Sequence, residues 1–176
     1  MVTSPNAYWL NFFLKREINV VCWNYRGYGE SEIGFFDQVD PFKSKQDVER
    51  VLAYAVNNLK LKGKLGVYGR SIGGLTACHL ASKYKDLIKL LMVDRSMDEI
   101  LSVINLKIRG TCTKVITDIL SCCWRTKNDQ NYIDVSPDCF KIITCDPMDD
   151  TVDVFGNLAS GVASKLAEID YTAARY

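Results

Sequence analysis

The sequence contains a single histidine, His79, among its 176 residues. One imidazole leaves too few ligands for a histidine-rich metal site, and the usual zinc-cluster pattern is missing because no C-x-x-C pair is present. No stretch reaches the roughly 18–20 apolar residues that a membrane-spanning helix needs. The first residues also lack the basic segment and apolar core of a signal peptide. We therefore expect neither a metal centre nor a transmembrane segment.

Neither sign of charge is in excess, because 22 Lys and Arg residues balance 21 Asp and Glu residues and the net charge is +1. Binding nucleic acid through bulk electrostatics requires a basic excess, so no nucleic-acid partner is expected. A hydrophobic content of 48% is sufficient for a buried core. The length corresponds to one domain of about 100–200 residues. We expect a single domain over residues 1–176 and leave its oligomeric state open.

Cysteine usage indicates the redox compartment. The seven cysteines are Cys22, Cys78, Cys112, Cys122, Cys123, Cys139 and Cys145. Their odd number does not suit a disulfide-stapled secreted module. Several lie within apolar runs, where a reduced cysteine behaves as a small hydrophobic residue. We expect a reducing compartment, and on that basis a cytoplasmic location.

Strand-like and helix-like apolar patterns alternate along the chain. The expected helices cover residues 5–15, 44–59, 97–107, 111–124 and 157–168, with one more after Gly74 that ends near residue 84. A capping box at Ser44 and Asp47 marks the start of the second helix. The expected strands cover 18–24, 65–68, 87–93 and 140–145, and 128–137 is expected as a polar loop. Because parallel strands need long crossovers, this order predicts an α/β fold with about four parallel strands flanked by helices.

The sequence Gly69-Arg70-Ser71-Ile72-Gly73 follows an expected strand and precedes an expected helix. It is a G-x-S-x-G pattern in the context that supports it. A nucleophilic serine projects its Oγ above the sheet from a tight turn, and the flanking Gly69 and Gly73 relieve the crowding there. The N–H of Ile72 would face a developing oxyanion at the positive end of the helix. A glycine-rich turn in which Ser71 only caps the helix is the structural alternative.

Four segments resemble the α/β-hydrolases, of the serine aminopeptidase-like and acyl-thioesterase-like kind. Residues 24–31 are similar to that family's segment after its fourth strand, and residues 69–74 to its nucleophile elbow. Asp94-Arg95-Ser96 resembles the loop after its sixth strand, and residues 146–152 resemble the loop after its seventh strand, which carries the triad acid. The resemblance begins at about Ala7 and implies an incomplete α/β-hydrolase domain.

The resemblance also implies roles for individual residues. Ser71 would be the nucleophile, Asp149 the triad acid, and the N–H of Ile72 part of the oxyanion hole. Asp146 and Asp150 are alternatives for the acid, and the choice among the three carboxylates stays open. Asp149 as a solvated loop carboxylate is the structural alternative. Asp94 is expected to be structural, holding its own loop in place.

The sequence departs from the family pattern at its C-terminal end. No histidine follows Asp149, so no imidazole stands where the family places the base that takes the proton of Ser71. His79 lies roughly 12 Å further along the helix axis than Ser71, at about 1.5 Å per residue. A hydrogen bond needs about 2.6–3.2 Å. We therefore expect His79 to be a helix-face residue and not a base.

A second departure lies at the N-terminal end. The family's third strand ends in a His-Gly turn that supplies another oxyanion N–H, but residues 1–6 are too short for that strand and contain Pro5. The expected strand 18–24 would then pair directly with 65–68 or leave a gap in the sheet. We expect an incomplete α/β-hydrolase domain with a small helical cap-like region at about 97–137.

The motif and the resemblance together imply a serine hydrolase-like protein that acts on an ester, thioester or amide through an acyl-serine intermediate. Without the triad histidine we expect it to be inactive or weakly active, and a non-catalytic binding or interaction module is the alternative. A nucleotide-binding domain is disfavoured, because residues 69–74 lack both the G-x-G-x-x-G spacing and a P-loop lysine. The substrate would be a small molecule or acyl compound selected by the cap-like region, where Trp124 and Tyr132 either line the site or pack. No metal and no organic cofactor is expected, since acyl transfer needs neither.

Overall fold

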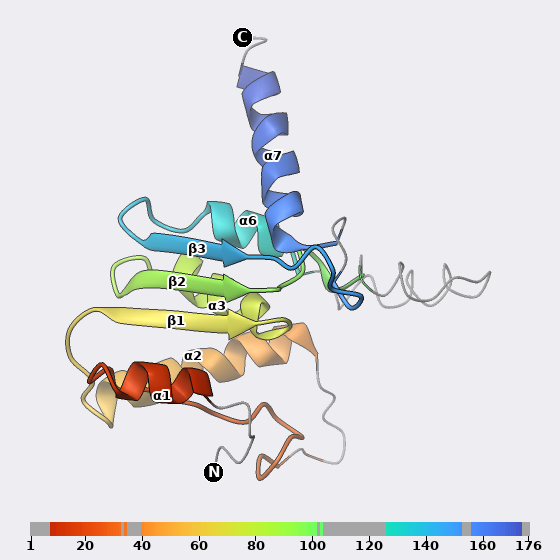
Figure 1. Cartoon of the computed structure of the whole chain (residues 1–176). Coiled ribbons are helices and arrows are strands. Elements are labelled where there is room, and N and C mark those ends of the chain that lie inside the picture. The colour runs from red at the N-terminus through yellow and green to blue at the C-terminus, as the bar shows by residue number, and fades with distance from the viewer. Residues whose placement is uncertain are drawn as a thin grey trace.

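The computed structural model describes residues 8–32, 34, 40–101, 103, 126–152 and 156–173. Figure 1 shows a parallel sheet with the strand order β1-β2-β3. The strands are β1 (Leu65–Arg70), β2 (Ile88–Asp94) and β3 (Phe140–Thr144). The described helices are α1 (Tyr8–Leu14), α2 (Pro41–Asn57), α3 (Gly73–Lys83), α6 (Asn128–Ile133) and α7 (Leu158–Ala173). A parallel sheet flanked by helices confirms the expected fold class.

The helices lie on both faces of the sheet. Helix α3 packs on β1 and β2, and both α2 and α6 pack on α3. Helix α1 contacts β1 through the rings of Trp9 and Tyr68, whose centroids are 5.7 Å apart. Because side chains alternate along a strand and Val67 packs into the core, Tyr68 and α1 lie on the opposite face. Helix α7 begins against α6 and extends away from the sheet (Figure 1).

The main hydrophobic core lies between the central strand and α3. Its buried residues are Ala77, Cys78, Ala81, Ile88, Leu91, Val93, Val135, Cys139, Leu158 and Val162. Ile88 and Leu91 of β2 are fully buried, as a central parallel strand requires. Fully burying a side chain of this size stabilises the fold by about 1.5–3 kcal/mol. This core fixes the sheet against α3, and therefore fixes the turn that joins β1 to α3.

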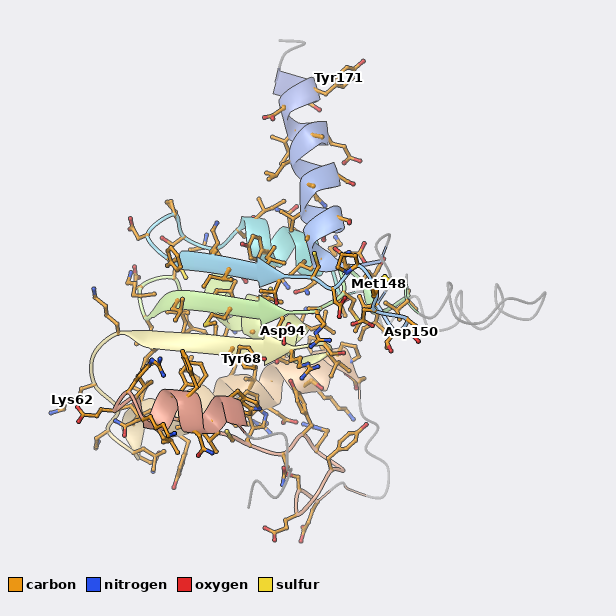
Figure 2. The ribbon with its side chains drawn as sticks, in the orientation of Figure 1. Lys62, Tyr68, Asp94, Met148, Asp150 and Tyr171 are labelled. Atoms are coloured by element: carbon orange, nitrogen blue, oxygen red, sulfur yellow. The ribbon has the colours of Figure 1, made fainter. Side chains whose placement is uncertain are left out.

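The register of the sheet brings the carboxyl ends of the strands to one edge. Arg70 is the register partner of Asp94, and Asp94 is the register partner of Thr144. Figure 2 shows Asp94 at this edge, with Met148 and Asp150 in the loop beyond β3, whereas Lys62 lies at the opposite edge. The segments after β1, β2 and β3 therefore converge, as expected for parallel strands.

The structure corrects the prediction of a strand at residues 18–24, which form no strand. A strand that is buried in a parallel sheet needs a neighbouring strand for its backbone groups, and the described residues provide none there. Ile18 and Cys22 are exposed instead, while the rings of Trp23 and Tyr25 pack at 5.9 Å. The described sheet therefore has three strands and not four.

Two further elements differ from the expectation. Helix α2 starts at Pro41 with Asp40 as its N-cap, whose carboxylate accepts from the N–H of Lys43. Ser44 lies inside the helix, where its hydroxyl donates to the carbonyl oxygen of Asp40. The expected loop 128–137 begins with α6, whose first residue Asn128 is fully buried and donates its side-chain amide to the carbonyl oxygen of Met97 at 2.7 Å. In this case a tertiary contact decided the structure of a polar segment.

The other expected elements that the structure describes are present, with shifted ends. Strand β1 extends the expected strand 65–68 by two residues, β2 is shifted by one residue at each end, and β3 is one residue shorter. Helix α7 runs five residues beyond the expected helix 157–168. In the expected helix 97–107, Ile100, Leu101 and Val103 are helical, but residues 97–99 are not, because Met97 forms an antiparallel bridge with Asn157 instead. The expected helix 111–124 and most of the cap-like region at 97–137 lie outside the described residues.

Candidate functional site

Ser71 lies in the tight turn between β1 and α3, in a left-handed backbone conformation with φ of 52°. Few residues other than glycine adopt this conformation, and it costs about 1–3 kcal/mol. Backbone hydrogen bonds on both sides hold the residue there. Its N–H donates to the carbonyl oxygen of Asp94 at 2.9 Å, and its carbonyl oxygen accepts from the N–H of Gly74 at 3.0 Å. The Ser71 hydroxyl makes no hydrogen bond with another described residue.

The steric requirement of this turn falls on Gly69 and Gly74. A Cβ at Gly69 would overlap the carbonyl group of Gly73, and a Cβ at Gly74 would overlap the side chain of Ser96. At Gly73, however, a Cβ would meet only the hydroxyl of Tyr25, at 4.0 Å. The expectation that Gly73 relieves crowding was therefore wrong, because a side chain at Gly73 would have room. The crowding instead involves the Gly73 carbonyl group, which lies close to Gly69.

The start of α3 adds a polar feature next to Ser71. Ile72 is the N-cap of α3 and contributes no side-chain hydrogen bond. Its N–H has no acceptor among the described residues, and the partial positive charge of a helix N-terminus lies here. An oxygen that carried negative charge would be stabilised at this position. The role of Ile72 in an oxyanion hole stays a prediction.

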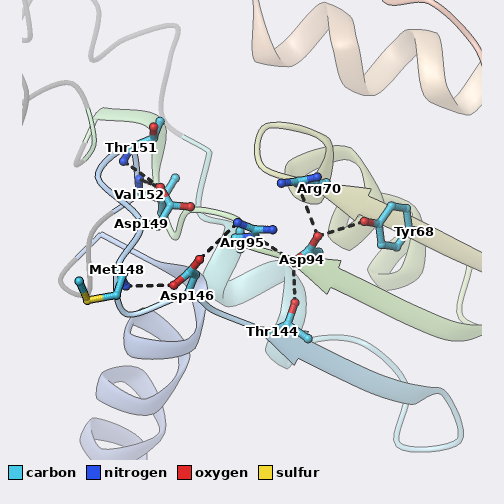
Figure 3. Close-up of polar contacts among 10 residues, drawn as sticks. All are labelled: Tyr68, Arg70, Asp94, Arg95, Thr144, Asp146, Met148, Asp149, Thr151 and Val152. Carbon is cyan, nitrogen blue, oxygen red and sulfur yellow. Dashed lines mark hydrogen bonds and ion pairs between the residues drawn. The ribbon is translucent and has the colours of Figure 1, made fainter. Parts of the chain in front are cut away.

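Asp94 is the centre of a polar network at the carboxyl edge of the sheet (Figure 3). Its carboxylate accepts from the hydroxyl of Tyr68 at 3.1 Å and from that of Thr144 at 2.8 Å. The guanidinium groups of Arg70 and Arg95 lie further away, at 3.6 Å and 3.5 Å. Asp94 thus joins side chains from all three strands, in agreement with a structural role.

The loop after β3 contains the three candidate acids. Asp146 forms an ion pair with Arg95 at 3.3 Å and accepts from the N–H of Met148. The Asp149 carboxylate accepts from the backbone N–H groups of Thr151 at 2.8 Å and Val152 at 3.0 Å (Figure 3). Asp150 is exposed. All three follow the carboxyl end of β3, but within the described residues no hydrogen bond joins any of them to Ser71, and the choice of acid stays open.

His79 contacts α2, and no hydrogen bond joins it to Ser71 among the described residues. Its Nε2 lies 2.6 Å from Oε1 of Glu49 on α2, and the same oxygen accepts from Nζ of Lys83 at 2.7 Å. Burial lowers the pKa of His79, and the hydrogen bond with Glu49 opposes that effect without overcoming it. His79 therefore joins α3 to α2, as expected for a helix-face residue.

An apolar pocket of about 210 Å³ opens beside the Ser71 turn. Its described lining consists of Tyr25, Tyr28, Asp40, Pro41, Ser44, Ile72, Leu75, Thr76 and Ile100. The polar groups of this lining are mostly paired within the protein. The hydroxyl of Tyr25 lies 2.8 Å from that of Thr76, the hydroxyl of Ser44 donates to Asp40, and the carboxylate of Asp40 caps α2. The pocket therefore offers an apolar ligand more contacts than a polar one.

Tyr25, Thr76 and Arg95 make contacts near the Ser71 turn and the carboxyl edge of the sheet that the sequence did not predict. Tyr25 contacts Thr76, and Arg95 pairs with Asp146. Both contacts link residues 51 positions apart in sequence, which no local pattern reveals. Tyr132 packs against the main core, so packing describes it better than lining a site. Trp124 lies outside the described residues.

The fold and the turn at Ser71 together define a partial α/β-hydrolase fold. The chain belongs to the serine aminopeptidase (S33) family, whose model matches residues 7–97, which is more than half of the chain.

Two curated yeast proteins are similar to the chain. "Uncharacterized membrane protein YNL320W" of Saccharomyces cerevisiae is 29% identical over 113 residues, which cover 59% of this chain and 38% of that protein. "Protein bem46" of Schizosaccharomyces pombe is 30% identical over 93 residues, which cover 53% of this chain and 30% of that protein. The chain thus spans well under half the length of both relatives. No solved structure matches it. Within the described part of the chain, every helix is too short or too polar to cross a membrane.

Proposed function

We propose that the chain carries the nucleophile site of a serine hydrolase and that Ser71 forms an acyl-enzyme with an ester, thioester or amide. The observation that carries this proposal is the left-handed conformation of Ser71 between β1 and α3. Four other described non-glycine residues share this conformation, but only Ser71 adopts it in a tight turn that joins a strand of the sheet to the following helix. Strained conformations of this kind cluster at active sites. The adjacent N–H of Ile72, at the start of α3, supplies a donor for the oxyanion.

In the proposed step the Ser71 Oγ bonds to the acyl carbon and the bond to the leaving group breaks. The proton of Ser71 passes by way of water to the departing oxygen, sulfur or nitrogen. Water then attacks the acyl carbon, the bond from that carbon to the Ser71 Oγ breaks, a proton returns to the Oγ, and a carboxylic acid leaves. His79 is held by Glu49, so the described residues supply no imidazole base at Ser71. We therefore expect slow turnover, because loss of a triad member removes most of the rate.

For the substrate we propose a compound with an apolar acyl group that enters the pocket beside Ile72. Three observations support it: the pocket adjoins the Ser71 turn, its lining is largely apolar, and its polar groups are mostly paired within the protein. A polar group placed in this pocket would lose hydrogen bonds with water and gain few in return. This assigns part of the substrate recognition to the residues around α2 and α3, in addition to the cap-like region.

Labelling with a fluorophosphonate tests the nucleophile. We expect the full chain to be modified at Ser71, as mapped by mass spectrometry, and Ser71→Ala to remain unlabelled. Ser164→Ala is a matched control, because Ser164 is an exposed serine on α7, and it should label as the wild type does. Absence of labelling in folded wild-type protein would contradict the proposal.

The second candidate is a non-catalytic binding module of the same fold. The contact between His79 and Glu49 favours it, because it occupies the chain's single imidazole away from Ser71. Folded protein that binds an acyl ester such as methyl octanoate, but is neither labelled at Ser71 nor hydrolytic, would support this reading over the first.

We also propose a cytoplasmic location. The described cysteines Cys22, Cys78, Cys139 and Cys145 are free thiols, which supports a reducing compartment. The Saccharomyces cerevisiae relative is named a membrane protein, so fractionation is the relevant test. Recovery of the native protein in a membrane fraction that resists a carbonate wash would contradict the proposal.

A further inference from the structure

A chain of hydrogen bonds runs from the hydroxyl of Tyr25 into the Ser71 turn. Tyr25 Oη lies 2.8 Å from Oγ1 of Thr76, and this Oγ1 donates to the carbonyl oxygen of Gly73 at 3.0 Å. A threonine hydroxyl has one proton to donate. Because Thr76 gives that proton to Gly73, Tyr25 must be the donor to Thr76. The two hydrogen bonds are therefore donated in one direction, from Tyr25 to Thr76 and from Thr76 to Gly73.

The Gly73 carbonyl, where these hydrogen bonds end, lies in a crowded part of the turn. It lies so close to Gly69 that a Cβ there would overlap it. Gly69 and Gly73 are the two ends of the pentapeptide that carries Ser71, so the position of this carbonyl sets how closely the strand and the helix approach. Thr76 is buried, with 3% of its surface exposed, so water is a poor substitute for its partner.

Tyr25 is held in place by contacts outside α3. Its ring packs on that of Trp23, and the neighbouring Arg26 makes two hydrogen bonds of 2.6 Å to the Asp47 carboxylate on α2. This ion pair is largely buried, with 15% and 20% of the two side chains exposed. Burial raises the pKa of Tyr25 above its usual range, and a hydrogen bond that the phenol donates favours its protonated form. The phenol therefore keeps the proton that it donates.

We propose that the hydroxyl of Tyr25 positions the Ser71 nucleophile by acting through Thr76 and the Gly73 carbonyl. Tyr25 also lines the pocket, and replacement by phenylalanine removes the hydroxyl while it keeps the ring. The inference rests on the proposed function, since it takes Ser71 as the nucleophile. Without the phenol hydroxyl, Thr76 loses a donor and the Gly73 carbonyl is held less firmly. A small displacement of the turn then misaligns the Ser71 Oγ, and misalignment of a reacting group slows a reaction.

The first test compares Tyr25→Phe with Tyr54→Phe in fluorophosphonate labelling. Tyr54 is an exposed tyrosine on α2, away from the chain of hydrogen bonds. We expect Tyr25→Phe to lower the maximal labelling rate by roughly twofold to tenfold, the range that one hydrogen bond supports. The probe concentration for half-maximal rate should not change, which separates positioning from binding. Labelling of Tyr25→Phe at the wild-type rate would overturn the inference.

A double-mutant cycle shows whether Thr76 transmits the effect. Thr76→Val should slow labelling as Tyr25→Phe does, and Thr76→Ser, which keeps the hydroxyl, should restore the rate. If the two groups act as one unit, the double variant should be no slower than the slower single variant. If the reductions in labelling rate of the two single variants multiply in the double variant, Tyr25 and Thr76 act independently. That result would overturn the proposal that Tyr25 acts through Thr76.

Amide hydrogen exchange tests the same idea without any reaction. The N–H groups of Ser71 and Gly74 report on the turn through their hydrogen bonds to Asp94 and Ser71. In Tyr25→Phe we expect both amides to exchange roughly twofold to tenfold faster, with no change at the N–H of Leu91 in β2. Unchanged exchange at the turn would overturn the inference even if the wild type is not labelled. Unlabelled wild type with faster exchange in the variant would instead reject only the nucleophile.

Discussion

At the scale of single residues, the conformation of the Ser71 turn depends on two glycines that flank it. Gly69 and Gly74 each lie where a methyl group would overlap a neighbour, the carbonyl of Gly73 in one case and Ser96 in the other. These contacts hold β1, α3 and the segment after β2 together within a few residues. The geometry around Ser71 therefore depends on close approach of backbone, which only glycine permits.

The pair Gly69→Ala and Gly73→Ala separates this requirement from helix propensity. We expect Gly69→Ala to lower the free energy of unfolding by about 1–3 kcal/mol, as overpacking does. Gly73→Ala should be neutral or slightly stabilising, because its Cβ has room at the first residue of α3. Urea denaturation followed by circular dichroism measures both. Equal destabilisation by the two substitutions would contradict the steric explanation.

The G-x-S-x-G pattern was sufficient to predict a turn at Ser71, because the pattern is local and lies between two strongly apolar segments. It was not sufficient to predict which glycines are required. Nor did it reveal that Asp94 accepts from Tyr68 and Thr144, since these residues are brought together by the sheet register. The tight turn was thus predictable because it depends on a few consecutive residues, whereas the contacts between different strands were not; the catalytic role of Ser71 stays a prediction.

At the scale of elements, the start of α2 shows how a local pattern is overridden. The sequence offered Ser44 as a cap, but Asp40 caps the helix and Pro41 occupies its first position. Proline is favoured there because the missing N–H would have no partner within the helix. The helix gains one turn at its beginning, which places Asp40, Pro41 and Ser44 in the wall of the pocket.

Substitution of Asp40 and of Ser44 shows which of the two residues caps α2. Asp40→Ala should lower the free energy of unfolding by about 1 kcal/mol, the usual effect of losing an N-cap side chain. Asp40→Asn should retain most of the stability because its amide oxygen still accepts. Ser44→Ala, within the helix, should have less effect than Asp40→Ala. The reverse order in thermal unfolding would place the helix start at Ser44 instead.

Residues 18–24 illustrate the limit of strand prediction. Their β-branched composition is typical of a strand, yet they form none in the structure. Strand propensity records how well a residue fits a pleated, partly buried surface, so it is realised only when a neighbouring strand is present. By contrast, β2 was predicted closely, because its apolar run lies between two strands that pair with it.

At the scale of the whole molecule, Asp98 connects several elements. It follows β2, its backbone N–H donates to Gly156, and its carbonyl oxygen accepts from the N–H of Asn128 in α6. Burial raises the pKa of its carboxyl to about 6, with further contributions from the negative charges of Asp129 and Glu99. The hydrogen bond from the N–H of Glu99 opposes the increase.

Asp98 should therefore make the protein less stable as the pH rises. Its folded pKa exceeds its unfolded value of 3.8, so the folded state binds the proton more tightly, and the stabilisation present below about pH 4 is lost as the pH rises through about 6. Asp98→Asn should be more stable than the wild type at pH 8, by about 1 kcal/mol after allowance for solvent screening of a half-exposed group. The difference should vanish near pH 4.

Melting temperatures measured from pH 4 to pH 8 check this dependence. Asp138→Asn is the control, because Asp138 is an exposed carboxylate in the loop after α6, and it should show no such trend. A variant at Asp98 that is less stable than the wild type at pH 8 would contradict the explanation.

The sequence by itself determined the α/β class, the strand–turn–helix at Ser71 and the mainly hydrophobic segments of β1, β2, β3, α3 and α7. These features depend on neighbours within a few residues, through apolar period and backbone preference. Only the tertiary structure decided that 18–24 forms no strand, that 128–133 is a helix, and that Tyr25 reaches Gly73 through Thr76. Each of these depends on a hydrogen-bond or packing partner distant in sequence, and such partners are defined only once the chain has folded.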